Sequence, residues 1–136
     1  MKQLQPYLAF QGKCEEALNF YVSALGGEIV SVMRFSEAPN EMPPELSNNI
    51  LHAVFKAGQI AFMASDGMPD HPHVVGNNIN LSIDLDTEEE QTQVFDKLAE
   101  GGTVTMPLND TFWGSRFGML VDKYGINWML SVEKPK

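Results

Sequence analysis

The sequence has little of what disulfide-bonded, zinc-binding and nucleic-acid-binding proteins need. Its single cysteine, Cys14, excludes an internal disulfide and a zinc site built from cysteine ligands. There are only 9 Lys and Arg residues against 18 Asp and Glu residues. The resulting net charge of −9 argues against nucleic acid and anionic lipid as partners, because both bind clustered basic side chains.

Long hydrophobic runs are also missing. No apolar stretch approaches the roughly 20 residues of a membrane-spanning helix. The N-terminus lacks the basic-then-apolar pattern of a signal peptide. These absences predict a cytoplasmic protein that binds neither membranes nor nucleic acid.

What is present suits one compact domain, since 43% of the 136 residues are hydrophobic. Apolar periodicity predicts two amphipathic helices, one beginning at Cys14 and one following Thr87, and each ends at a glycine pair, Gly26-Gly27 or Gly101-Gly102. Strands are expected at residues 2–10, 28–35, 50–56, 59–65, 78–85, 103–106, 117–121 and 126–132.

The two halves of the chain repeat one pattern. Phe20 and Phe95 each lie six residues before a glycine pair that leads into a strand. The order βαβββ occurs twice, so we expect an internal duplication and an α+β fold. A single domain would hold module one at 1–66, a linker at 67–77 and module two at 78–136. Each sheet would cover one face with its helix and curl the other into a shared cup.

Three stretches carry a resemblance to a known family. They are PYLAFQGKCEEALNFYVSALGGE, ILHAVFKAGQIAFMASD and EGGTVTMPLNDTFWGSRFGMLVDKYGINWML. In this order they resemble the PhnB-like branch of the glyoxalase/bleomycin-resistance/extradiol-dioxygenase (vicinal oxygen chelate) superfamily. The resemblance implies paired βαβββ modules, a curved mixed sheet around a central cup, and usually a homodimer. Exposed sheet edges also favour a homodimer, because such edges are commonly paired or covered.

Some relatives carry a 3-demethylubiquinone methyltransferase label. The sequence has no glycine-rich strand-to-helix turn of the kind that holds a nucleotide-like cofactor, because both glycine pairs end helices. We therefore predict no cofactor.

The metal ligands of related proteins give a second expectation. In metal-dependent members of the superfamily, His, Gln or Glu on the first and last strands of each module bind the ion. The matching positions here fall near Pro6, Phe62, Asn78 and Met129, and a shift by one or two residues gives Gln5, Met63 and Asn80. Divalent ions need several converging carboxylates or imidazoles. The usual metal site is therefore predicted to be lost.

Five residues are predicted to bind a ligand in the cup. Phe62, Trp113 and Met129 would form its apolar wall. His52 would be a polar anchor or acid–base group, or else a partly buried histidine with a hydrogen-bond partner. Arg116 would hold a carboxylate, phosphate or phosphonate, or else would pair with Asp110 or Asp122 while Trp113 simply packs.

Four other features have weaker functional signals. His71 and His73 could chelate an ion, although a solvated linker is the simpler interpretation. Asp66 is expected to cap the linker turn, or else to face the pocket, and Cys14 to be an inert core residue at the start of a helix. Residues 36–49 form a long, proline-rich loop, which predicts a mobile lid with Met42 resting on the ligand.

Two classes of function remain open from the sequence. One is a binding protein that holds a small organic molecule in an apolar cup without a metal. The alternative is an enzyme of lyase, isomerase or transferase type acting on a small oxygenated or phosphonate-like substrate, with its catalytic residues unknown.

Overall fold

The computed structural model describes residues 1–39 and 43–135 and divides the chain into two compact units. Unit 1 is Met1–Val74 and unit 2 is Val75–Lys136, so the division falls within the predicted linker, 67–77.

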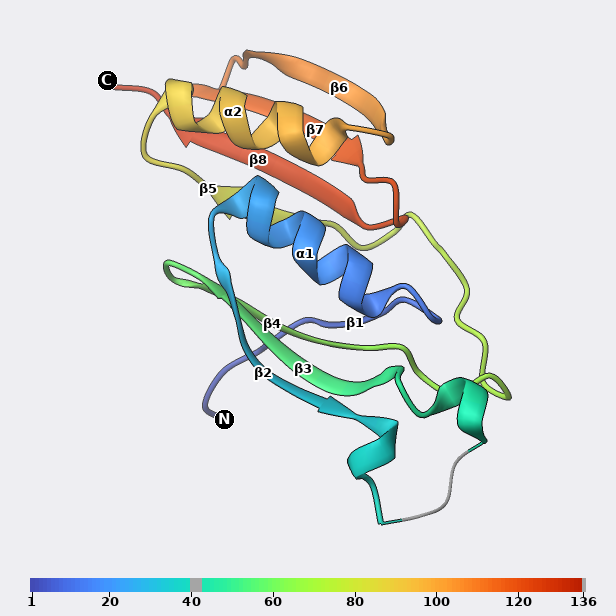
Figure 1. Cartoon of the computed structure of the whole chain (residues 1–136). Coiled ribbons are helices and arrows are strands. Elements are labelled where there is room, and N and C mark those ends of the chain that lie inside the picture. The colour runs from blue at the N-terminus through green and yellow to red at the C-terminus, as the bar shows by residue number, and fades with distance from the viewer. Residues whose placement is uncertain (40–42, 136) are drawn as a thin grey trace. The chain divides into compact units, whose positions relative to one another are not determined.

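Both units have the same strand topology (Figure 1). Unit 1 contains β1 (Tyr7–Ala9), α1 (Cys14–Leu25), β2 (Glu28–Arg34), β3 (Ile50–Ala57) and β4 (Ile60–Ser65), with the sheet order β1-β4-β3-β2. Unit 2 contains β5 (Leu81–Asp84), α2 (Glu88–Ala99), β6 (Thr103–Asp110), β7 (Ser115–Val121) and β8 (Asn127–Glu133), with the order β5-β8-β7-β6. In each sheet the first pair is parallel and the others are antiparallel. The predicted α+β class and paired βαβββ modules are confirmed.

The glycine pairs have the same two tasks in both units. Gly26 and Gly101 adopt positive φ angles of 74° and 73° where the helices end. A Cβ on Gly27 would lie 2.3 Å from the Lys56 carbonyl oxygen, and one on Gly102 would lie 2.2 Å from the Val121 carbonyl oxygen. The second glycine of each pair therefore lets the next strand approach its neighbour closely.

The two sheets also share one register. Met63 pairs with Tyr7 in the parallel pair and with Val54 in the antiparallel pair of unit 1. In unit 2, Met129 pairs in the same way with Ser82 and with Met119. Met63, one residue beyond Phe62, is therefore the structural counterpart of Met129.

Several elements differ in length from the prediction. β1 begins only after Pro6, which has no amide hydrogen to donate but accepts a 3.0 Å hydrogen bond from the amide of Met63. β5 covers four residues rather than eight, and β6 continues beyond Met106 to Asp110.

The predicted lid contains ordered turns. Short 3₁₀ helices lie at Phe35–Glu37 (η1) and Pro44–Leu46 (η2). The ends of the segment are joined by hydrogen bonds from the amide of Phe35 to the Asn49 oxygen, 3.0 Å, and from Ser36 to Ser47, 2.9 Å. Met42 lies outside the described residues.

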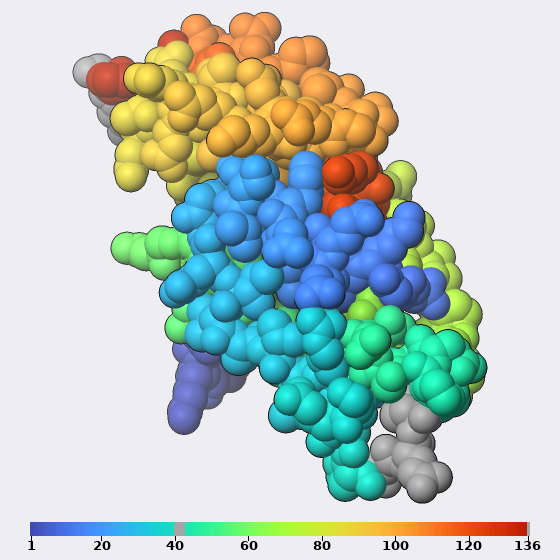
Figure 2. All heavy atoms as spheres, in the orientation of Figure 1, coloured from blue at the N-terminus to red at the C-terminus, as the bar shows by residue number. Residues whose placement is uncertain are grey.

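Each helix covers one face of its own sheet and leaves the other face uncovered by that helix. In unit 1 the Tyr21 ring of α1 packs edge-on against Phe62, which stacks on Phe55. In unit 2 a Cβ on Gly118 would lie 2.9 Å from the Phe95 ring of α2. Figure 2 shows the outer sides of both helices at the surface of their units. Neither helix, at 12 residues each, is long enough to cross a membrane, and no other described helix is longer.

Alternation along the strands then decides where the candidate residues point. Leu130 is the direct partner of Gly118, Leu120 lies two residues after Gly118, and Trp128 is the partner of Leu120. These three residues therefore share the α2-covered face of unit 2. Phe117, Met119 and Met129 lie on the opposite side, which we call the α2-distal face.

Candidate functional site

The α2-distal face carries a row of three methionines. Met106 of β6 is the direct partner of Met119 of β7, which is the direct partner of Met129 of β8. Ser82 of β5 completes the row. β6 is an edge strand with register shifts on both sides of Met106, whose side chain is 45% exposed. We call Met106, Met119 and Met129 the methionine row.

Aromatic rings continue this apolar surface at one end. Phe117 lies two residues from Met119 on the same face, and the Trp113 ring packs edge-on against it at 5.9 Å between centroids. Phe112 packs edge-on against Trp113 at 5.1 Å. Gly114, with a φ of 93°, forms the turn between them and β7. Trp113 is 58% exposed, so its ring is open to a ligand as well as in contact with Phe117.

The charge on this face has one sign. Asp84 of β5 pairs with Ser131 of β8, which lies two residues after Met129. Glu133 lies two residues further along β8 and pairs with Ser115. Both carboxylates are therefore on the same face as the methionine row. Arg116 is the only basic residue in the four strands of unit 2, all of which are described. Alternation with Phe117 places Arg116 on the α2-covered face.

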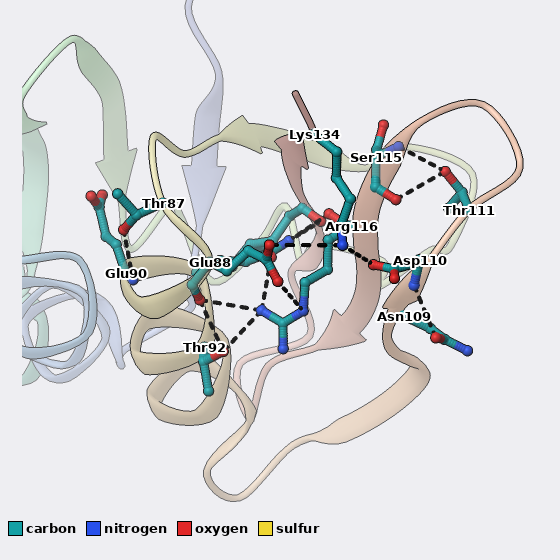
Figure 3. Close-up of polar contacts among 12 residues, drawn as sticks. Thr87, Glu88, Glu90, Thr92, Asn109, Asp110, Thr111, Ser115, Arg116 and Lys134 are labelled. Atoms are coloured by element: carbon teal, nitrogen blue, oxygen red, sulfur yellow. Dashed lines mark hydrogen bonds and ion pairs between the residues drawn. The ribbon is translucent and has the colours of Figure 1, made fainter. Parts of the chain in front are cut away.

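Contacts of Arg116 agree with that placement (Figure 3). Its Nη1 donates to the Glu88 carbonyl at 3.2 Å, to Gln91 Oε1 at 3.1 Å and to Thr92 Oγ1 at 2.9 Å. Its Nε lies 3.6 Å from the Glu88 carboxylate. Arg116 thus joins β7 to the first turns of α2, and its ion-pair partner is Glu88 rather than the predicted Asp110 or Asp122. Lys134 instead pairs with Asp110 at 2.8 Å.

Gln91 completes this junction and was missed from the sequence. Its side chain is 0% exposed, and its Nε2 donates to the carbonyl oxygens of Arg116, at 2.8 Å, and Leu130, at 3.1 Å. The signal was its spacing, since Gln91 falls at helical intervals with Val94 and Leu98 on the apolar face of α2.

His52 and Phe62 point to opposite faces of the unit 1 sheet. The Nδ1 of His52 lies 3.0 Å from the hydroxyl of Tyr7, and the two rings are 5.6 Å apart. Phe62 is 1% exposed beneath α1, in the aromatic core with Tyr21. The five predicted residues therefore separate. Trp113 and Met129 belong to the α2-distal surface, His52 lies away from α1, and Phe62 and Arg116 belong to helix-covered faces.

Asp66 caps α1 from a position far along the chain. Its Oδ1 accepts hydrogen bonds from the amides of Gly12, at 2.7 Å, and Cys14, at 2.9 Å, while its Oδ2 accepts from Ile50 at 2.7 Å. Burial, with a smaller effect of the Asp66 charge, raises the pKa of the Cys14 thiol to about 12. Asp66 therefore caps the start of α1 rather than the predicted linker turn, while the burial of Cys14 agrees with its predicted inert character.

A polar cleft of about 410 Å³ lies beside this cap. Arg34 crosses it, with Nη2 2.5 Å from the Glu15 carboxylate and Nη1 2.6 Å from the Asn48 carbonyl oxygen. The remaining lining residues are Gly12, Asn49, Ile50 and Asp66. Arg34 is already paired with Glu15, and the Asp66 carboxylate already accepts three backbone amides, so neither group is left free to hold a ligand.

Possible metal ligands are scattered. Within residues 1–39 and 43–135, no group of three or more His, Cys, Asp or Glu side chains is placed to hold an ion. His71 is exposed near Asp70, at 3.9 Å, and His73 has a buried Nδ1 without a hydrogen-bond partner among the described residues.

The strand-to-helix turns do not fit a nucleotide-like cofactor. Such a cofactor needs free amides at the turn and no buried carboxylate competing for them. In the β1–α1 turn, the amides of Gly12 and Cys14 are already bonded to Asp66. The β5–α2 turn, residues 85–87, has no glycine.

Comparison with known proteins places this architecture in a family. The sequence matches the family described as 3-demethylubiquinone-9 3-methyltransferase over residues 2–131. The crystal structure of PA1353 from Pseudomonas aeruginosa is 38% identical with a TM-score of 0.88, covering 99% of this chain and 100% of that one. A structure from Bacillus cereus, described as a putative 3-demethylubiquinone-9 3-methyltransferase, PhnB protein, is 36% identical with a TM-score of 0.80, covering 96% and 99%.

A more distant structure shares the fold alone. The glyoxalase/bleomycin resistance protein from Albidiferax ferrireducens T118 is 15% identical, with a TM-score of 0.62 over 96% of this chain and 98% of that one. The matched register of the two sheets, the glycine pairs and these similarities lead to one assignment. The chain belongs to the PhnB-like (3-demethylubiquinone-9 3-methyltransferase-like) family, and it shares its fold with a glyoxalase/bleomycin resistance protein.

Proposed function

We propose that this protein binds a small organic molecule against the α2-distal face of unit 2, and that this face is the apolar wall predicted from the sequence for Trp113 and Met129. The observation that carries the proposal is the methionine row, extended by Phe117 and Trp113. Organic ligands are commonly held by apolar and aromatic surfaces with few polar anchors. Methionine side chains adapt to ligands of different shape.

Two of the predicted ligand contacts are kept in this proposal, and two are reassigned. Met129 and Trp113 belong to the binding surface. Phe62 is assigned to the core beneath α1, and Arg116 to the junction between α2 and its sheet, because their contacts are made there.

The binding experiment compares the affinity for a dye after substitution of a methionine in the row, Met119, and of a methionine in an exposed loop, Met68. Nile red, a neutral dye, should bind saturably to the wild-type protein with enhanced fluorescence. Met119→Gln places a polar amide in the centre of the row and should weaken binding at least tenfold. Met68→Gln, in an exposed loop, is the matched control and should leave the affinity unchanged. Absence of saturable binding to the wild type, or equal losses in both variants, would refute the proposal.

The proposal includes no metal of the kind found in related enzymes. Of the positions matched to metal ligands, Pro6 and Phe62 have no donor atom, and Met129 offers a soft thioether. Elemental analysis of the purified protein should find no stoichiometric zinc, nickel, manganese or iron. A stoichiometric ion whose removal lowers the melting temperature would contradict this part of the proposal.

The hydrogen-bonded pair of Tyr7 and His52 favours a second candidate function. A histidine that contacts a hydroxyl at 3.0 Å could transfer a proton to or from a small oxygenated substrate. The test is to follow a mixture of small hydroxy and keto acids by NMR. Consumption that disappears in both His52→Gln and Tyr7→Phe would support an enzyme. No consumption by the wild type would leave the binding protein as the better account.

Methyl transfer, which the family name implies, is not part of the proposal, because both strand-to-helix turns fail to fit the cofactor.

We also propose a homodimer. The edge strands β2 and β6 expose Val30, Val32, Met33, Val104 and Met106, and such edges are commonly covered by a partner. Light scattering should give about twice the mass of one 15.1 kDa chain, and a monomer mass would refute the dimer. A cytoplasmic location stays a prediction from the sequence.

A further inference from the structure

We infer that the molecule bound on the α2-distal face is flat, conjugated and free of negative charge. This inference rests on the proposed function and names the class of ligand. It is drawn from three features of unit 2, namely the methionine row, the aromatic end of that row and the distribution of charge.

The methionine row forms a continuous floor. Side chains of directly paired residues start about 5 Å apart, so three in a row extend over about 10 Å, close to the length of a three-ring system. Each thioether favours contact with an aromatic ring over contact with an aliphatic group. Met119 lies in the centre, between Met106 and Met129, so a flat molecule on this floor contacts all three.

Aromatic rings select the same class at the end of the floor. Phe117 stands beside Met119, and Trp113 rests edge-on against Phe117 while most of its own surface stays exposed. Aromatic pairs prefer offset-stacked or edge-to-face contacts. An added conjugated ring can therefore make such contacts with Trp113 without displacing it from Phe117.

The negative charge of the α2-distal face excludes anionic ligands. A carboxylate, phosphate or phosphonate taken out of water needs a cation or several hydrogen-bond donors. Arg116, the only basic residue in the four strands, lies on the other face and donates to three acceptors at the start of α2. The α2-distal face instead carries the carboxylates of Asp84 and Glu133. A neutral ligand meets no penalty there, and a cation is attracted.

Four probe molecules test separately whether the surface selects for a flat aromatic ring system and for the absence of negative charge. Acridine is flat and neutral at pH 8, 9-aminoacridine is a flat cation, acridine-9-carboxylate is a flat anion, and cyclododecanol is neutral and aliphatic. By calorimetric titration, acridine and 9-aminoacridine should bind, and acridine-9-carboxylate should bind at least tenfold more weakly than either.

Met119→Leu then tests the role of sulfur, because leucine keeps the apolar volume. It should weaken acridine binding about two- to tenfold, the range expected from a sulfur–aromatic contact. It should leave cyclododecanol binding unchanged. Met68→Leu, in the exposed loop, is the matched control, and an unchanged melting temperature verifies that Met119→Leu is folded.

The outcomes distinguish this inference from the proposed function. If none of the four probes binds, the proposed function fails. If acridine-9-carboxylate or cyclododecanol binds as tightly as acridine, the ligand class is wrong while the binding function stands. Equal weakening of acridine and cyclododecanol by Met119→Leu would also overturn the ligand class.

Discussion

The carboxylate of Asp66 accepts a hydrogen bond of 2.9 Å from the backbone amide of Cys14, and so caps α1 from the end of β4. The same carboxylate holds the first residue of β3 through the amide of Ile50. One buried side chain therefore fixes a helix start and two strand ends, in the place of a cap from the adjacent residue Lys13, which makes no side-chain cap.

Replacing Asp66 should destabilise the fold strongly. Asp66→Ala leaves the amides of Gly12, Cys14 and Ile50 without their acceptor in a buried site, which should lower the free energy of unfolding by about 3–5 kcal/mol. Urea denaturation measures the change. Asp70→Ala, in an exposed loop, is the control and should change stability by less than about 0.5 kcal/mol. Similar losses in the two variants would show that the cap is unimportant.

The Cys14 thiol should resist modification in the folded protein. Its pKa is raised to about 12 by burial and by the charge of Asp66, so it stays protonated at pH 8. Iodoacetamide should label it only in denaturant. Because the folded pKa lies above the unfolded one, the thiol's contribution to stability is present below pH 9 and is lost as the pH rises from 9 toward 12. Rapid labelling without denaturant would contradict the burial of this residue.

Gly102 should tolerate no side chain. Gly102→Ala would place a Cβ 2.2 Å from the Val121 carbonyl oxygen, and the backbone shift needed should cost about 2–3 kcal/mol. Gly76→Ala is the matched control, since its added Cβ would have no neighbour closer than 3.7 Å. Thermal denaturation of both variants tests the difference. Equal melting temperatures would mean that β6 can move away from β7 without cost.

Arg116 should matter for stability and not for binding. Arg116→Met removes its hydrogen bonds to Gln91 and Thr92 and should lower stability by about 1–2 kcal/mol, because the side chain is only partly exposed. Lys134→Met, which breaks a more exposed ion pair, should lower stability less than Arg116→Met does. Affinity for a neutral dye should be unchanged in both. A selective loss of binding in Arg116→Met would return this arginine to the site.

The sequence contained most of the fold because its signals are local. Glycine pairs marked the helix ends, and Thr87 marked the start of α2 by accepting a hydrogen bond from Glu90. The capping of α1 was harder to predict, since Asp66 and Cys14 lie 52 positions apart.

The face on which each candidate residue lies is harder to predict from the sequence, because successive residues of a strand point to opposite faces. Phe62 lies one residue before Met63, the counterpart of Met129, and therefore points to the core face beneath α1. Arg116 lies one residue before Phe117 and therefore points away from the α2-distal face. Met106 was missed because β6 was expected to end there, whereas the strand continues with register shifts that bring Met106 beside Met119. Register between distant strands is not readable from one sequence.

The most direct test of the account is methionine-methyl NMR. Protein labelled with ¹³C at the methyl groups of its 8 methionines would be titrated with 9-aminoacridine, and each signal assigned by a Met→Leu variant. We expect the signals of Met106, Met119 and Met129 to shift together and to saturate at one affinity, while the signal of Met68 stays in place. Saturable binding that leaves these three signals unmoved would contradict it.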